Sequence, residues 1–141
     1  LTVAVSVVPL RTQKLIEVTS KALYEGIAVV RAGARIGDIG YAIQQCVERE
    51  GFSVVRELAG HGVGHHAHEE PMILNFGKKG TGEQLVAGMT IAIEPMVTAG
   101  DWRIKTDEDG WGIRTMDGSL AAHFEHTLLV TKDGCEILTK V

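Results

Sequence analysis

Residues 36–55, IGDIGYAIQQCVEREGFSVV, contain the point at which the periodicity of the apolar side chains changes. The first part of this stretch has apolar residues at helical spacing, at Ile36, Ile39, Ile43, Cys46 and Val47. Gly51 follows where a left-handed glycine commonly closes a helix. The β-branched run from Phe52 to Val55 then favours a strand. The stretch therefore predicts that helical structure gives way to strands near Gly51.

A second helix is predicted upstream. Apolar residues recur there at helical spacing, at Leu15, Val18, Ala22, Leu23, Ile27 and Val30. Arg31-Ala32-Gly33 is a stop signal, and because the link is short we expect the two helices to pack antiparallel. The run from Leu1 to Val5 has the composition of a strand. Since a chain rarely begins inside a strand, we expect further sequence to precede it.

Downstream of Gly51, short strand-like runs alternate with glycine-containing turns. We expect strands over Phe52–Val55, Met89–Ile93, Trp102–Lys105, Ile113–Met116 and His123–Thr131. The turn signals are typical of hairpins and occur at Asp109-Gly110, Asp117-Gly118 and Asp133-Gly134. Helices followed by strands predict an α+β fold, in which two antiparallel helices cover one face of a curved, mainly antiparallel sheet. We expect residues 1–141 to form a single domain portion.

Composition excludes several classes of protein. The chain of 141 residues carries a formal net charge of −4 and has no cluster of Lys and Arg, so nothing favours nucleic-acid binding. No apolar run approaches the roughly 20 residues that cross a bilayer. No signal-peptide pattern is present, and we therefore expect a cytoplasmic protein. Cys46 and Cys135 lie far apart and are expected to be reduced, buried thiols.

The segment GHGVGHHAHEEP, residues 60–71, holds four of the six histidines. Glycines alternate around His61, and glycine lets a backbone or a ligand approach closely. An imidazole offers a neutral nitrogen to a metal ion, or a donor and an acceptor for proton transfer. A glycine-rich surface turn that happens to contain histidines is the structural alternative.

Two glutamates interrupt apolar strands farther along. Glu94 lies in IAIEPMV and Glu125 in HFEHTLLV. A carboxylate in such a place is costly unless it is paired, hydrogen-bonded or bound to a metal. The alternatives are a strand end at which Glu94 reaches water, and an edge strand whose start at Glu125 is solvated.

The three features together predict metal-assisted hydrolysis. One histidine and two glutamates at strands or strand ends can converge on one side of a curved sheet. A site with one imidazole and several carboxylate oxygens suits Mn, Fe, Co or Zn as divalent ions. Such an ion activates water, and a neighbouring histidine can hydrogen-bond the substrate carbonyl.

The motifs GHGVG, HEEP, IEPM and FEHT resemble those of the type I methionine aminopeptidases of the pita-bread metallopeptidase family, in order and in spacing. The resemblance implies that His61, Glu94 and Glu125 bind a pair of divalent metal ions. It also implies that His68 is the catalytic histidine at the scissile amide, and that Glu94 accepts a proton from water. Trp111 matches a tryptophan that lines the pocket for the methionine side chain.

The chain departs from the family pattern in three respects. Two aspartate ligands of the family belong to an N-terminal half that these residues do not include, and so do another histidine and several pocket residues. Ala67 stands where an aromatic residue is common, which affects the fit of the methionine pocket. His65 and His66 are also unusual, and we expect them to be outer or surface residues rather than ligands. We therefore expect weakened binding of a metal pair and an incomplete enzyme.

The implied activity is removal of the initiator methionine from nascent chains whose second residue is small, at the ribosome, with the missing half or a complementing chain as partner. A related pita-bread peptidase, such as an Xaa-Pro aminopeptidase, is one alternative. A non-catalytic peptide-binding relative is another, although it has no need to keep His61, His68, Glu94 and Glu125.

Overall fold

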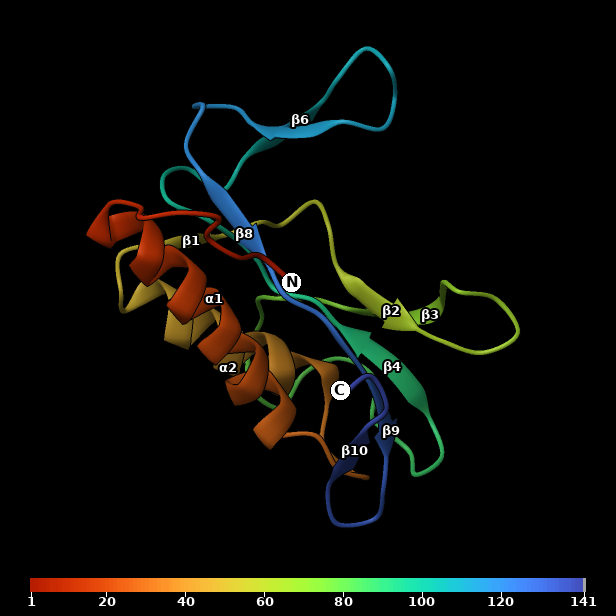
Figure 1. Cartoon of the computed structure of the whole chain (residues 1–141). Coiled ribbons are helices and arrows are strands. Elements are labelled where there is room, and N and C mark those ends of the chain that lie inside the picture. Colours follow the sequence, from red (N-terminus) through yellow and green to blue (C-terminus); the bar gives the residue numbers. More distant parts are fainter. Residues whose placement is uncertain (141) are drawn as a thin grey trace.

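The computed structural model describes residues 1–140, in which two helices precede ten short strands (Figure 1). The helices are α1, Leu10–Ala28, and α2, Ile36–Glu48. The strands are β1 (Ser53–Val54), β2 (Gly60–Gly62), β3 (Glu69–Ile73), β4 (Thr90–Ile93), β5 (Met96–Thr98), β6 (Ile104–Thr106), β7 (Ile113–Thr115), β8 (Ala121–His123), β9 (His126–Val130) and β10 (Cys135–Ile137). This order confirms the predicted change from helices to strands.

The two helices are antiparallel, as predicted. Lys14 near the start of α1 pairs with Glu50 just beyond α2, at 2.5 Å between Nζ and Oε2. At the other end of α1, Gly26 lies against the side chains of Ile39 and Ile43 in α2. The absence of a side chain at Gly26 lets the helices approach closely, because a Cβ there would crowd Ile43.

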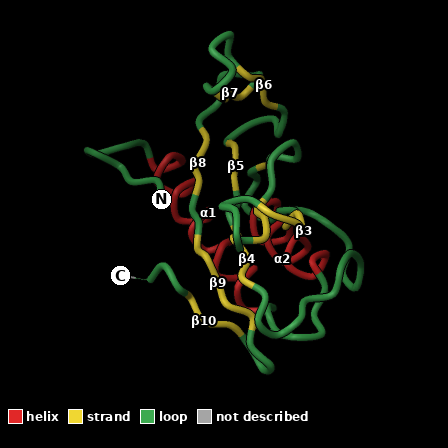
Figure 2. Tube along the Cα trace, turned by 90° about the vertical axis from the view of Figure 1, so that its right-hand side faces the viewer, coloured by secondary structure: helices red, strands yellow, loops and turns green. Residues whose placement is uncertain are grey.

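Two of the sheets lie end to end, because one pair of adjacent strands continues from the first sheet into the second. One contains five strands in the order β10-β9-β4-β2-β3 and the other three in the order β1-β5-β8, with every neighbouring pair antiparallel. The β4–β9 pair passes into the β5–β8 pair at two facing interruptions, Glu94-Pro95 and Phe124-Glu125 (Figure 2). Pro95 has no N–H to donate to the ladder, which favours the break. Both glutamates are thereby brought to the junction of the two sheets.

The helices cover one face of the sheets (Figures 1 and 2). Helix α1 contacts β4, β5 and β8, and α2 contacts β1 and β3. The core between these layers is fully buried and includes Leu15, Leu23, Ile39, Ile43, Ile91, Ile93, Val97 and Leu128. Burial of these side chains against each other is the main force that holds the sheets to the helices.

Three sequence-based expectations were wrong in detail. The run Leu1–Val5 is not a strand, because its backbone has no ladder partner and only Thr2 is bonded, to the backbone of His123. Asp117-Gly118 is a turn but not a hairpin, since β7 pairs with β6 and β8 pairs with β5. The expected strand His123–Thr131 is divided into β8 and β9 by Phe124-Glu125.

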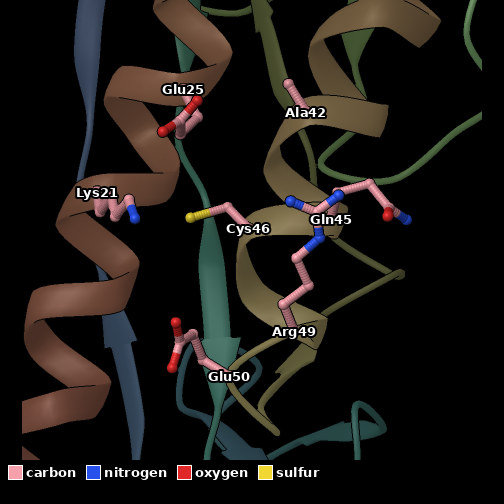
Figure 3. A pocket seen from close by; sticks show the side chains of 7 residues that line it. All are labelled: Lys21, Glu25, Ala42, Gln45, Cys46, Arg49 and Glu50. Atoms are coloured by element: carbon pink, nitrogen blue, oxygen red, sulfur yellow. The ribbon is translucent and has the colours of Figure 1, made fainter.

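Both cysteines are free, as expected, but each is half-buried rather than buried. Cys46 lies in a shallow pocket of about 320 Å³ between α1 and α2, beside Lys21 and Arg49 (Figure 3). Burial raises the pKa of both the Cys46 and the Cys135 thiol, which favours the protonated form. Neither helix within residues 1–140 combines the length and apolar character that a membrane crossing requires.

Candidate metal centre

Strand β2 places His61 between two neighbouring strands. A Cβ on Gly60 would overlap the Ala92 carbonyl oxygen of β4, and one on Gly62 would overlap the Glu70 carbonyl oxygen of β3. The glycines beside His61 are therefore required by the close approach of both neighbours. The β2–β3 register is irregular between Gly60 and Gly62, and such a bulge changes the direction of the side chain that it contains.

The tautomer of His61 follows from its backbone contact. Its Nδ1 lies 2.9 Å from the Gly62 carbonyl oxygen, which can only accept a hydrogen bond. The neutral ring must therefore carry its proton on Nδ1, and Nε2 keeps a free lone pair. Nε2 lies 3.4 Å from Glu94 Oε1, so in this neutral form of the ring two acceptor atoms face each other. A cation is the natural group to lie between two such atoms.

Glu94 is fixed through its backbone as well. It follows β4 directly, and its side chain is only 16% exposed. Asn75 is fully buried and donates from Nδ2 to the Glu94 carbonyl oxygen, at 3.0 Å. Asn75 was not singled out from the sequence, because no local pattern distinguishes a buried asparagine from one in a surface loop.

Glu125 completes a cluster of possible ligands. One donor atom each from His61, Glu94 and Glu125 all lie within 4.8 Å of one another, and no other such group of three occurs in residues 1–140. Ligands that bind one ion at about 2.0–2.2 Å lie roughly 3–3.5 Å apart, close to the His61–Glu94 separation. One imidazole lone pair and two carboxylates therefore fit a divalent cation in both charge and spacing.

His68 lies beside this cluster. It ends the loop between β2 and β3, and its ring centroid is 4.2 Å from that of His61, with the planes tilted by 56°. The side chain is exposed, which leaves it accessible to a ligand that approaches the cluster. The loop before it is also exposed at His65, His66 and Ala67, and neither of these histidines belongs to the group of possible ligands.

An apolar pocket of about 300 Å³ lies beside β5 and β8, and its lining includes His123, whose ring faces Glu94. It is lined mainly by Val55, Leu58, Met96, Ile104, Ile113 and Ala122, with Thr2 and His123 also in the lining. Trp111 is not in this lining. It lies in the loop between β6 and β7 and is 89% exposed, so the structure does not bring it together with the cluster.

The sequence is similar to those of known proteins. The model of metallopeptidase family M24 matches residues 1–132. A methionine aminopeptidase from Salmonella typhimurium is 53% identical over 127 residues, which are 90% of this chain and 48% of that protein. One from Rickettsia prowazekii is 51% identical over 133 residues, or 94% of this chain and 51% of that protein. This chain thus spans about half the length of the curated relatives that it matches.

The structural comparison agrees with the sequence comparison. The crystal structure of the Rickettsia prowazekii methionine aminopeptidase superposes with a TM-score of 0.93, at 49% identity over 96% of this chain and 55% of that chain. This match confirms the predicted α+β pita-bread fold. An X-Pro aminopeptidase from Thermotoga maritima has a TM-score of 0.72 at 17% identity, which shows the shared fold alone. The extent of the family match and the identity with these relatives establish that the chain belongs to metallopeptidase family M24.

Proposed function

We propose that this chain is the metal-binding part of a methionine aminopeptidase, which hydrolyses the peptide bond after an N-terminal methionine. The observation that carries the proposal is the cluster of His61, Glu94 and Glu125 with His68 beside it. The names of relatives at about 50% identity support the same activity. The substrates are nascent chains at the ribosome, in the cytoplasm, with a small second residue.

His61 Nε2, a Glu94 oxygen and a Glu125 oxygen are the proposed metal ligands in this chain. A divalent ion of Co, Mn, Fe or Zn supplies Lewis acidity, which makes a hydroxide nucleophile available near neutral pH. We expect the complete site to hold two ions. This chain has three of the ligands, and the two aspartates implied by the family resemblance lie outside it, so the second ion is expected to bind weakly to these residues alone.

The remaining proposed roles belong to side chains at the cluster. The His68 imidazole donates a hydrogen bond to the scissile carbonyl oxygen, where negative charge develops during attack by water. Glu94 accepts a proton from the attacking water, which suits a carboxylate with a free lone pair. The apolar pocket around Met96 is the proposed contact for the methionine side chain. Trp111, the contact that the family resemblance implies, lies outside this lining, and we propose that it reaches the side chain only in the complete enzyme.

The 141 residues are proposed to be one portion of a catalytic domain whose other half, or a complementing chain, supplies the remaining ligands. The isolated chain is therefore expected to bind one divalent ion and to release methionine slowly, if at all. This expectation follows from the ligand count, because a bridged metal pair needs more protein ligands than three.

The test measures metal binding and hydrolysis on the same samples. Calorimetry with Co(II) on the purified chain should give binding that Glu94→Ala abolishes, whereas His65→Ala, which changes an exposed histidine outside the cluster, should leave it unchanged. Release of methionine from Met-Ala-Ser should depend on His68. Cleavage of an Xaa-Pro peptide instead would assign the other pita-bread activity. The absence of Co(II) binding would contradict the proposed metal centre.

A further inference from the structure

His123 has a buried ring nitrogen that the proposed mechanism does not use. It is the last residue of β8 and lies opposite Met96 of β5. Its side chain is 42% exposed as a whole, but Nε2 is buried and forms no hydrogen bond with acceptable geometry. Buried polar atoms without a partner are uncommon, and each one calls for a physical reason.

The polar atom that faces this nitrogen is a carboxylate oxygen of Glu94. His123 Nε2 lies 3.4 Å from Glu94 Oε2, while His61 Nε2 lies 3.4 Å from Glu94 Oε1. The carboxylate is therefore placed between two imidazoles, one at each oxygen. The two rings differ in one respect, because the Gly62 carbonyl fixes the proton of His61 on Nδ1.

The position of His123 is set by its backbone. Its N–H donates to Thr2 Oγ1 at 2.9 Å, and the Thr2 hydroxyl donates to the His123 carbonyl oxygen at 3.0 Å. On the opposite edge, His123 lies across from Met96 of β5. The ring thus extends from a backbone whose N–H and C=O are both bonded to Thr2 and whose register partner on the other side is Met96, which limits the directions in which Nε2 can point.

We propose that His123 is a positioning residue for Glu94: its Nε2–H donates to Glu94 Oε2 and turns Oε1 toward the metal ion. At 3.4 Å the two atoms are within reach of each other but do not form a hydrogen bond in this structure, and in the proposed arrangement a small rotation of the ring or of the carboxylate forms the bond. Oε2 has two lone pairs, so one remains to accept a proton. The role in metal binding rests on the proposed function, whereas the His123–Glu94 contact does not.

The contact between His123 and Glu94 suits a hydrogen bond better than a second metal ion. A protein metal site needs about three ligands or more, and within residues 1–140 the only such group contains Glu94 with His61 and Glu125, without His123. A hydrogen bond needs a single acceptor, which Glu94 Oε2 provides. Residues that orient a ligand in this way typically change metal affinity about 10- to 100-fold when they are removed.

The first experiment compares His123→Ala, His123→Gln and the control His65→Ala by Co(II) calorimetry and Co(II) visible absorption. We expect His123→Ala to weaken Co(II) binding about tenfold and to change the spectrum. The glutamine amide can donate in place of Nε2–H and should restore both to within about threefold. Unchanged binding in His123→Ala would overturn the proposal. A loss in His123→Gln as large as that in His123→Ala would overturn it too, because the ring itself would then be a ligand.

The second experiment needs no metal. Nitrogen-15 NMR of the histidine rings, at a pH at which the spectrum shows one proton per ring, should show His123 protonated on Nε2. Glu94→Gln should shift that signal and Glu125→Gln should not. A proton on Nδ1 of His123, or a signal insensitive to Glu94, would overturn the inference. If the unmodified chain binds no Co(II), the proposed function fails while this measurement still decides the contact.

Discussion

At the scale of single residues, the site depends on side chains that are not themselves ligands. The sequence motifs identified His61, Glu94, Glu125 and His68 because their chemistry is unusual for apolar strands and glycine-rich turns. Asn75 has no such signal, yet it bonds the Glu94 backbone from a fully buried position. The functional roles of the motif residues stay predictions, whereas the geometry that holds Glu94 is visible in the structure.

Asn75→Ala is expected to destabilise the protein and to weaken metal binding together. Loss of the donor leaves the Glu94 carbonyl oxygen unpaired in the interior, which costs about 1–3 kcal/mol. The backbone that carries Glu94 then loses one fixed point, and Co(II) affinity should fall roughly tenfold. Urea denaturation and Co(II) calorimetry measure the two effects.

Gln84→Ala is the matched control, because Gln84 donates one bond to the Gly33 carbonyl oxygen from an exposed position. Its effect on stability should be small and its effect on Co(II) binding absent. A loss of stability in Asn75→Ala with unchanged Co(II) affinity would restrict Asn75 to a structural role.

At the scale of elements, the sequence predicted both helices and the approximate place of the strands around Glu94 and Glu125. It did not predict that each of these strands divides in two. Periodicity reports which face of a strand is buried, but it does not report which partner a strand pairs with. The junction arises because Ile93 pairs with His126 and Met96 with His123, leaving the residues between them outside both ladders.

Strands β2 and β3 were missed for a related reason. In β2 the residues around His61 are glycines, which are poor strand formers in isolation. Their extended conformation is favoured by pairing on both sides, with β3 and β4, and by the close approach that glycine permits. This tertiary arrangement cannot be read from local composition.

The base of the β6–β7 hairpin is held by one carboxylate, and this predicts a local response to acid. Asp117 accepts from the N–H of Asp101 at 2.7 Å and from the N–H of Ser119 at 2.9 Å. These bonds, the one from Asp101 foremost, lower the pKa of Asp117 from 3.8 to about 2. Because the folded-state pKa is depressed, the stabilisation is complete above about pH 4 and is lost as the pH falls toward 2.

The measurement is an NMR titration of the Asp101 and Ser119 amide signals, which should move together with a midpoint at about pH 2. Asp117→Asn should abolish this transition and loosen the hairpin base at neutral pH, because the amide lacks the charge that strengthens both bonds. Asp133→Asn, in the β9–β10 turn, is the control and should leave the transition in place. A midpoint close to the ordinary value for aspartate would contradict the proposed anchoring.

At the scale of the whole molecule, the helices protect one face and leave the other open. Exposed apolar side chains gather in two segments, the N-terminal segment before α1 and the region from Trp111 to Leu120, and they include Leu1, Val3, Val5, Val7, Trp111, Ile113, Met116 and Leu120. Exposed apolar surface of this extent commonly marks a place where another segment packs. Since the chain spans about half of each curated relative, the other half of such a protein is the proposed occupant.

At this scale, the contacts between residues far apart in the sequence could not be predicted. Thr2 and His123 are 121 residues apart, and their hydrogen bonds bring the N-terminal segment to the edge of the candidate site. No periodicity or motif links such distant positions. The layer order could be predicted because each layer has its own local pattern, but the pairing between layers could not.

A chimaera tests whether the two halves act together. Joining the N-terminal half of the Rickettsia prowazekii methionine aminopeptidase to Leu1 of this chain should restore a second metal equivalent and raise methionine release at least tenfold over the isolated chain. The physical reason is that the added half brings further ligands to His61, Glu94 and Glu125, and ions bind more tightly as the number of protein ligands rises. The same chimaera should bind less of a dye that reports exposed apolar surface.

The control is the chimaera with His68→Ala, which should keep both metal equivalents and lose methionine release. If this variant stays active, the added half carries the chemistry and this chain serves only as a scaffold. If the chimaera folds and binds two ions but releases no methionine, the departures within this chain, with Ala67 foremost, become the cause. Ala67→Phe in the same chimaera then decides between two causes. Recovery of methionine release indicates that the pocket was too wide, and continued lack of release indicates an inactive metal centre.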